Sequence, residues 1–163
     1  MLQNKGTLSG NQIHTLLTPQ NLTATTQSDV FNMANYNHAS IIISVGVAGT
    51  ATFAVTLEYC DDNTPTTDTA MAFNYRKMTD GAGATDSWGA LTAAISSGIT
   101  LDTASQTVVI DIDAAEIPTA SGSTESRLAV KFTDPSAADS FISCVVVLSE
   151  PRFPQNTPHT AID

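Results

Sequence analysis

Three histidines, His14, His38 and His159, are the side chains best suited to general-base or metal chemistry. Two lie in the terminal segments, and His38 falls in a segment expected to be a loop before the first strand of the body. None stands beside a serine or cysteine in a nucleophile elbow, and neither H-x-x-H nor C-x-x-C occurs. The sequence therefore predicts neither a hydrolase triad nor a zinc site.

Carboxylates come close together in the sequence at two places. Asp111 and Asp113 are expected on the outward face of one strand, where a pair of acids could hydrolyse glycosides but where solvated charges are the ordinary use. Residues 61–63 and Asp68 could offer oxygen ligands to calcium, yet their spacing lacks the order of an EF-hand and its bidentate Glu. Turn formation is the preferred interpretation of that acidic segment.

Four aromatic residues, Tyr36, Tyr59, Tyr75 and Trp88, could together form a platform on which a sugar ring stacks. Tyr59 and Tyr75 alternate into the apolar face of what look like neighbouring strands, which favours core or interface packing. A carbohydrate-binding module stays open as an alternative. The glycine-rich residues 81–84 lack the Lys-Ser/Thr of a phosphate-binding loop, so nucleotide binding is not expected.

Short apolar or alternating segments must position these side chains. The pattern predicts strands at about ten-residue intervals with turn residues between them, which is typical of an antiparallel β-sandwich or jelly roll. A helical turn is expected at residues 113–116, closed by Pro118, and a helical turn or bend at residues 29–33. The expected strands are residues 41–47, 52–59, 71–76, 88–92, 99–101, 106–112, 126–133 and 141–148.

The last of these strands, residues 141–148, is apolar on both faces. Such a strand is either central in a sheet or covered by a second subunit. We therefore expect Phe141, Val145 and Val147 to lie in an interface.

The chain divides by pattern into an extended N-terminal arm (residues 1–28), a β-sandwich domain (residues 29–153) and a C-terminal tail (residues 154–163). The arm has no sustained period, but its apolar residues are spaced too regularly for a solvated tail. Docking on another protein is one interpretation, and an N-terminal strand of the domain's own sheet within residues 16–25 is the other. The expected anchors of the arm are Leu8, Ile13, Leu16, Leu17 and Leu22.

With 163 residues, the chain is long enough for one domain with a core of its own. Charged residues make up 13% of it, against a typical value of about 25%. The net charge is −10, and the six Lys and Arg residues form no patch larger than Arg76 and Lys77, so nucleic-acid binding is not expected. The acidity can instead supply solubility or attraction to a basic protein surface.

Neither a Sec signal peptide nor an apolar run long enough to span a membrane is present in the sequence, so we expect synthesis in a cytoplasm and no membrane partner. Cys60 and Cys144 are expected as buried free thiols, with a bridge between them as the less favoured alternative. We expect no cofactor and no metal.

The same strands resemble a family of tailed-bacteriophage head decoration, or capsid cement, proteins. The resemblance covers residues 29–153 and lies in their pattern, not in a catalytic signature. The segments that carry it are residues 32–36 (Asn-Met-Ala-Asn-Tyr), 57–62 (Leu-Glu-Tyr-Cys-Asp-Asp), 72–77 (Ala-Phe-Asn-Tyr-Arg-Lys) and 88–92 (Trp-Gly-Ala-Leu-Thr).

The resemblance implies a protein without catalytic residues that sits on the outer surface of the capsid, often as a homotrimer. Its partner would be the major capsid protein, whose neighbouring subunits it bridges to oppose the internal pressure of the DNA. A minor tail or neck component is the alternative within the virion.

Overall fold

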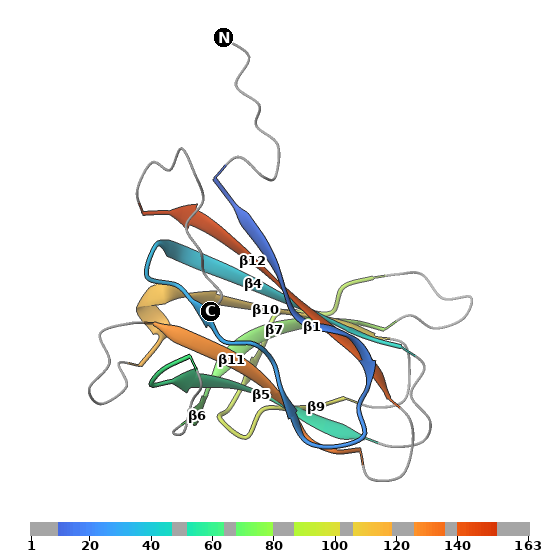
Figure 1. Ribbon diagram of the computed structural model, residues 1–163. Coiled ribbons are helices and arrows are strands. Elements are labelled where there is room, and N and C mark those ends of the chain that lie inside the picture. Colours follow the sequence, from blue (N-terminus) through green and yellow to red (C-terminus); the bar gives the residue numbers. More distant parts are fainter. Residues whose placement is uncertain are drawn as a thin grey trace.

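The computed structural model describes residues 10–46, 52–63, 68–79, 87–101, 106–118, 126–135 and 140–152. Its strands form two packed antiparallel sheets, which confirms the expected all-β sandwich. Sheet A has the strand order β1-β12-β4-β10-β7-β8, and sheet B has the order β2-β11-β5-β6 with β3 and β9 paired to β11 and β5. Figure 1 shows β12, β4 and β10 above β11, β5 and β6.

The chain passes back and forth between the two sheets several times. Their bounds are β1 Gln12–Asn21, β2 Thr26–Gln27, β3 Phe31–Asn32, β4 Tyr36–Val45, β5 Phe53–Cys60, β6 Asp68–Met71, β7 Phe73–Thr79, β8 Thr92–Ala94, β9 Ile99–Leu101, β10 Gln106–Asp113, the 3₁₀ helix η1 Ala114–Glu116, β11 Arg127–Phe132 and β12 Phe141–Pro151.

Period-two alternation explains how sheet A presents two different faces. Ile110 is paired with Ile41, which is paired in turn with Val146, and all three side chains are buried in the sandwich. The next residue on each strand points the other way, so Val109 and Ile42 lie side by side on the outside of the sheet. The register of strand pairing thus determines which side chains enter the core and which lie on the outer face.

The core lies between the sheets and is almost wholly apolar. In sheet B, Leu128, Val130 and Phe132 point inward as expected, while Arg127 and Lys131 point outward. The rings of Phe132 and Phe53 pack at a centroid distance of 6.5 Å. Fully burying one such side chain stabilises the fold by roughly 1.5–3 kcal/mol, so the core needs no disulfide or metal.

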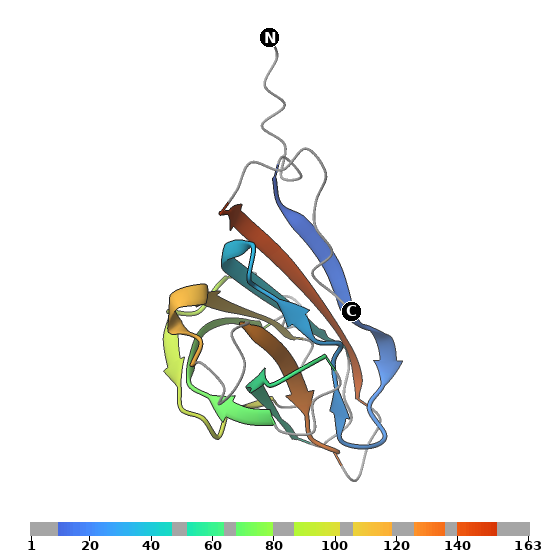
Figure 2. The ribbon, with the colours of Figure 1, turned by 60° about the vertical axis from the view of Figure 1, so that its left-hand side comes forward.

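An extended arm over residues 12–28 was the wrong interpretation, and the alternative of a strand in the domain's own sheet holds. β1 pairs with β12 along ten residues, at the edge of sheet A in both views (Figures 1 and 2). Leu16 and Leu22 are each 1% exposed and belong to the core, and Leu17 packs against it. The physical reason is that pairing with β1 satisfies the backbone hydrogen bonds along one edge of β12. In addition, β1 buries apolar side chains in the sandwich. Leu8 and residues 154–163 lie outside the described residues.

Residues 88–92 do not form the expected strand, because Trp88 makes only an isolated bridge and β8 begins at Thr92. Other smaller expectations were also wrong. Residues 71–76 do not form one strand: β6 ends at Met71 and β7 begins at Phe73 in the other sheet, with the exposed Ala72 between them. Tyr59 and Tyr75 are consequently in different sheets. Residues 29–33 contain the extended β3 instead of a helical turn. The helical turn after Asp113 is confirmed as η1.

Candidate interaction surface

The outer face of sheet A carries a row of side chains that crosses four strands and is apolar on three of them. Val145 on β12 is paired with Ile42 on β4, which is paired with Val109 on β10, and Val109 is paired with Arg76 on β7. The three apolar residues of this row are half-buried. We call Val145, Ile42, Val109 and Arg76 the outer row.

More apolar side chains flank the outer row and are more exposed. Ile13 on β1 is directly opposite Val147 on β12, and Phe141 begins β12. Beyond β7, Trp88 makes an isolated bridge with Met78. Ile13 is 49% exposed, Phe141 55% and Trp88 49%. Exposed apolar side chains gathered on one sheet face in this way can form a protein–protein contact surface.

The structure brings together some, but not all, of the predicted interface residues. Ile13, Phe141, Val145 and Val147 lie on the outer face of sheet A, although Ile13 was assigned to an arm and the others to the body. Ile42, Val109 and Trp88 were missed. A signal for Ile42 and Val109 is present in the sequence, because both interrupt apolar–polar alternation with an apolar residue at an outward position.

A shallow hollow of about 340 Å³ lies beside the outer row and is lined by Arg76, Trp88 and Val109. Trp88 is held there by its bridge to Met78 and by the Gly89 amide, which donates to the Lys77 carbonyl at 2.9 Å. The Arg76 Nη1 donates to the Gly89 carbonyl at 3.4 Å. The indole ring is therefore presented on the sheet face, where it can contact a partner.

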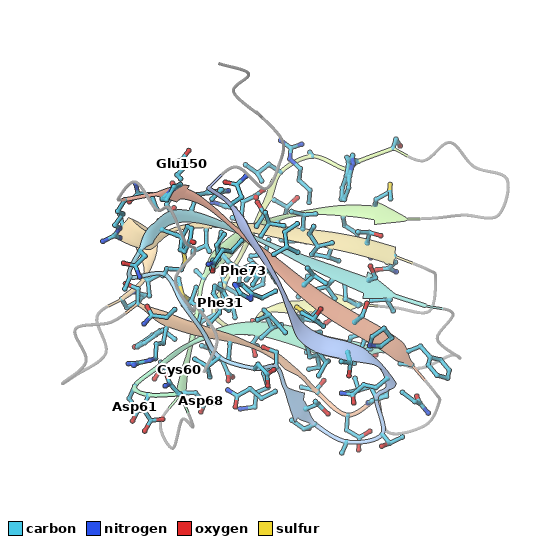
Figure 3. All side chains as sticks on the ribbon, turned by 45° about the horizontal axis from the view of Figure 1, so that its top comes forward. Phe31, Cys60, Asp61, Asp68, Phe73 and Glu150 are labelled. Carbon is cyan, nitrogen blue, oxygen red and sulfur yellow. The ribbon has the colours of Figure 1, made fainter. Side chains whose placement is uncertain are left out.

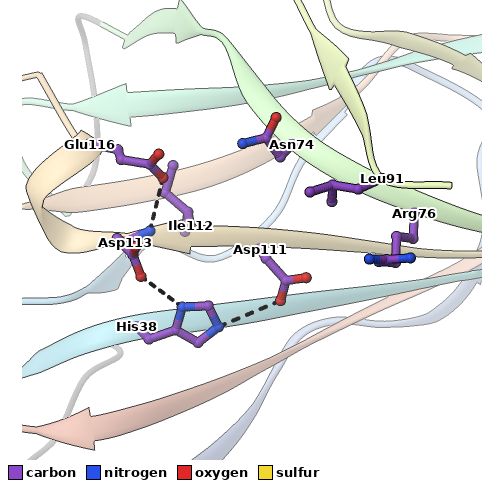
Figure 4. Close-up of a pocket in the computed structure, with 8 residues that line it drawn as sticks. All are labelled: His38, Asn74, Arg76, Leu91, Asp111, Ile112, Asp113 and Glu116. Carbon is purple, nitrogen blue, oxygen red and sulfur yellow. Dashed lines mark hydrogen bonds and ion pairs between the residues drawn. The ribbon is translucent and has the colours of Figure 1, made fainter.

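A polar cluster borders the outer row (Figure 4). His38 Nδ1 is 2.9 Å from Asp113 Oδ1, and His38 Nε2 is 3.5 Å from Asp111 Oδ1. The Ser40 hydroxyl donates to Asp111 Oδ1 at 2.7 Å. His38 lies in β4 and not in the expected loop, whereas Asp111 and Asp113 face outward as expected.

The cluster contains the residue types of a hydrolase triad, since His38 Nε2 is 3.3 Å from Ser40 Oγ. The single hydroxyl hydrogen of Ser40 is, however, directed to Asp111 and not to the histidine. Ser40 also lies on an extended strand and not on the sharp strand-to-helix turn that exposes a nucleophile. The arrangement can bind a ligand through hydrogen bonds, and it lacks the geometry of an activated serine.

A second polar cluster lies on the outer face of sheet B. Lys131 Nζ is 3.4 Å from Glu58 Oε1 and 3.5 Å from Asp68 Oδ2, and Gln27 Nε2 donates to the same two carboxylates. Burial, followed by the neighbouring Asp68, raises the pKa of Glu58. The hydrogen bond with Glu58 lowers the pKa of Asp68. Lys131 therefore pairs with two carboxylates whose pKa values are shifted in opposite directions.

The two cysteines are free thiols and lie in different parts of the sandwich. Cys60 is on the outer face of sheet B, near Asp61 and Asp68 (Figure 3), and Cys144 is in the core. Burial raises the pKa of each thiol to about 12, and carboxylates including Asp68 add to the effect at Cys60. Neither thiol is suited to act as a nucleophile near neutral pH.

Within the described ranges, no three His, Cys, Asp or Glu side chains gather in a way that could hold a metal ion. The same part of the chain contains no helix with the length and apolarity needed to cross a membrane.

The chain matches no protein-family model and no curated protein sequence. Among solved structures it is similar to the SPBc2 prophage-derived protein YomS, with a TM-score of 0.43 and 11% identity over 84% of this chain and 92% of that one. It is also similar to the CBM22-1–GH10 modules of Clostridium thermocellum xylanase 10B complexed with xylohexaose (TM-score 0.32, 14% identity, 94% of this chain and 28% of that one). A third is a structure of infectious bursal disease virus, Gt strain (TM-score 0.24, 10% identity, 91% of this chain and 43% of that one). At TM-scores below 0.5 these similarities assign no function to this chain.

Proposed function

We propose that this chain is a non-enzymatic structural protein of a tailed-bacteriophage virion. It decorates the outer surface of the capsid and bridges neighbouring subunits of the major capsid protein. The observation that carries the proposal is the outer face of sheet A, where the outer row and Ile13, Phe141 and Trp88 present apolar side chains to a partner. The resemblance of residues 29–153 to decoration proteins supplies the identity of that partner.

The size of the face suits this role. Five strands at a spacing of about 4.8 Å, with a length of about 30 Å, give a face of roughly 600 Å². That area is at the lower end of what one partner contributes to a specific interface, so a single subunit would bind modestly. Several linked copies would bind much more tightly through avidity, and we therefore propose a homotrimer as the attached form.

The test measures binding of the purified protein to capsids that are assembled from the major capsid protein encoded with it and that lack this chain. Ile13→Asp places a charge on the outer face, and Ile95→Asp is the matched control, because Ile95 is 72% exposed and lies outside the outer row. We expect Ile13→Asp to reduce occupancy by at least about tenfold and Ile95→Asp to leave it unchanged. Equal occupancy of both variants would exclude this face as the docking surface.

The number of copies per virion distinguishes decoration from the alternative role in a tail or neck. Quantitative mass spectrometry of virions should find this chain in proportion to the major capsid protein, and electron microscopy should place it over the whole shell. A few copies at a single vertex would contradict decoration. Wild-type protein that fails to bind capsids at all would contradict the proposal itself.

A further inference from the structure

Two hollows on the outer face of sheet A adjoin at Arg76, which lines both of them, and we call the two hollows together the groove. The first is the hollow beside Trp88 and Val109. The second has a volume of about 230 Å³, and its lining includes Asn74, Leu91 and several acidic residues. Figure 4 shows the residues that line this second hollow. From Val109 to Asp113 the groove follows β10 for roughly 13 Å, the length of about four residues of extended chain.

The two ends of the groove differ in chemistry. At one end, Trp88 and Val109 offer an aromatic ring and an aliphatic side chain. At the other end, the hollow is lined by three acidic residues from β10 and η1, namely Asp111, Asp113 and Glu116. A ligand that matches both ends carries an apolar part and a cationic part.

The internal contacts leave the carboxylate end with a net negative charge. Arg76 is the only lysine or arginine among the residues that line the second hollow, and its Nη1 is directed to the Gly89 carbonyl. Glu116 Oε2 accepts a hydrogen bond from the Asp113 amide at 3.2 Å, and His38 contacts one oxygen each of Asp111 and Asp113. Each carboxylate can accept several hydrogen bonds, so the group retains capacity for a cation.

We propose, on the basis of the function proposed above, that this groove binds an extended segment of the major capsid protein that carries an arginine. The guanidinium contacts Asp111, Asp113 and Glu116, and the apolar neighbours of the arginine lie on Val109 and Trp88. Arginine fits better than lysine because its planar fork can bind two carboxylates at once.

Charge also argues against the two other occupants of such a groove. A second copy of this chain carries a net charge of −10, so face-to-face contact would bring more carboxylates to an already acidic groove. A neutral glycan could stack on Trp88 but would supply no positive charge to the three acidic residues that line the second hollow. A cationic segment uses both ends of the groove.

The experiment measures binding of the full chain to the same capsids as a function of salt. The test variant is Asp111→Asn combined with Asp113→Asn, which keeps the shape and one acceptor oxygen of each side chain but removes two charges. The matched control combines Asp29→Asn with Asp134→Asn, which makes the same change of net charge at two exposed positions outside the groove. Thermal unfolding of each variant establishes that it is folded.

We expect the groove variant to bind capsids at least about tenfold more weakly than wild type, and the control variant to bind as wild type does. Raising NaCl from 50 to 500 mM should weaken the wild type more than the groove variant, because salt screens only the charges that remain. Trp88→Ala should weaken binding without changing the salt dependence.

Three results would overturn the inference. If the groove variant binds capsids as well as the wild type does, the groove does not bind a cationic segment. The proposed function would stand in that case. Glycan-array binding that Trp88→Ala abolishes, with capsid binding unaffected, would assign the groove to a carbohydrate. If the protein dimerises in solution, and the groove variant dimerises more strongly because two negative charges are gone, the face binds a second copy of this chain.

Discussion

Ile13 and Val147 lie directly opposite each other in the ladder between β1 and β12, although one is near the beginning and the other near the end of the described chain. Both side chains are on the outer face of sheet A. The β1 end of the candidate interaction surface, which Ile13 supplies, therefore forms only when the N-terminal and C-terminal strands are paired. Any change that loosens β1 should weaken binding as well as stability.

The first prediction separates the two faces of β1. Leu16→Ala should destabilise the protein by about 2–5 kcal/mol, because Leu16 is 1% exposed and its loss leaves a cavity in the core. Ile13→Ala should change the free energy of unfolding by no more than about 0.5 kcal/mol, since Ile13 is half-exposed. Urea unfolding of both variants measures the difference. If Leu16→Ala is as stable as wild type, residues 12–21 do not belong to the sheet.

The second prediction concerns the turn between β8 and β9. Gly98 has a φ of +79°, and a Cβ at this position would lie 2.1 Å from the Val55 carbonyl oxygen. Gly98→Ala should therefore cost about 3 kcal/mol or more, from backbone strain together with the clash.

Gly46→Ala is the matched control for that substitution. A Cβ there meets the Phe141 Cβ at 3.3 Å, and the backbone of Gly46 is outside the left-handed region. Its cost should stay near 1 kcal/mol in the same thermal or urea unfolding experiment. Equal losses in the two variants would contradict the close approach of Gly98 to β5.

The third prediction uses the thiols. Because burial raises the pKa of Cys60 and Cys144 to about 12, both should resist iodoacetamide at pH 8 in the folded protein and react once urea unfolds it. Mass spectrometry of the alkylated protein counts the modified thiols. Rapid alkylation of Cys144 below the unfolding transition would contradict its place in the core.

The fourth prediction is a pH dependence at Glu58. Its pKa is raised above 4.5, mainly by burial and next by Asp68, so its contribution to stability is complete below pH 4.5 and is lost as the pH rises through the folded-state pKa. In Glu58→Gln the side chain stays neutral at every pH, so this loss of stability does not occur. The glutamine amide can still donate a hydrogen bond to Asp68. The variant should gain stability over the wild type at pH 7 and lose this advantage below pH 4.5.

Asp68 acts in the opposite direction and in a different pH range. Its pKa is lowered below 3.8, chiefly by the hydrogen bond with Glu58, so its contribution is present above pH 3.8 and is lost as the pH falls through the folded-state pKa. Urea unfolding between pH 3 and pH 7 therefore separates the two groups. Glu150→Gln, at an exposed position, is the control and should match the wild type over this range. An advantage of Glu58→Gln that persists at pH 4 would contradict the assignment.

Strand positions could be predicted wherever polar and apolar residues alternate, as in Val108, Ile110 and Ile112 on β10. The break at Ala72 could not be predicted. Met71 and Phe73 both face the core, so the sequence keeps the alternation of a single strand although the chain changes sheet between them. β1 was predicted only as the alternative to an arm, and over residues 16–25, for the opposite reason. Its register shifts between Thr15 and Leu17 and again before Gln20 interrupt the alternation that marks a strand.

The candidate site was predictable one strand at a time but not as a surface. The apolar outward residues of β12 were identified because that strand is apolar on both faces. Their neighbours Ile42 and Val109 depend on the pairing of β4 with β12 and β10, which no local pattern specifies. The same pairing brings His38 to Asp111 and Asp113, residues that are far apart in the sequence.

The position of β12 between β1 and β4 also sets the order of events during folding. Neither β1 nor the free edge of β4 can complete its hydrogen bonds until β12 has been synthesised, and pairing between such distant segments is slow. We expect a nascent chain to remain incompletely folded, with the edge of β4 unpaired, until β12 leaves the ribosome. The candidate interaction surface would then form late, and we expect only a chain with a completed sheet A to present it.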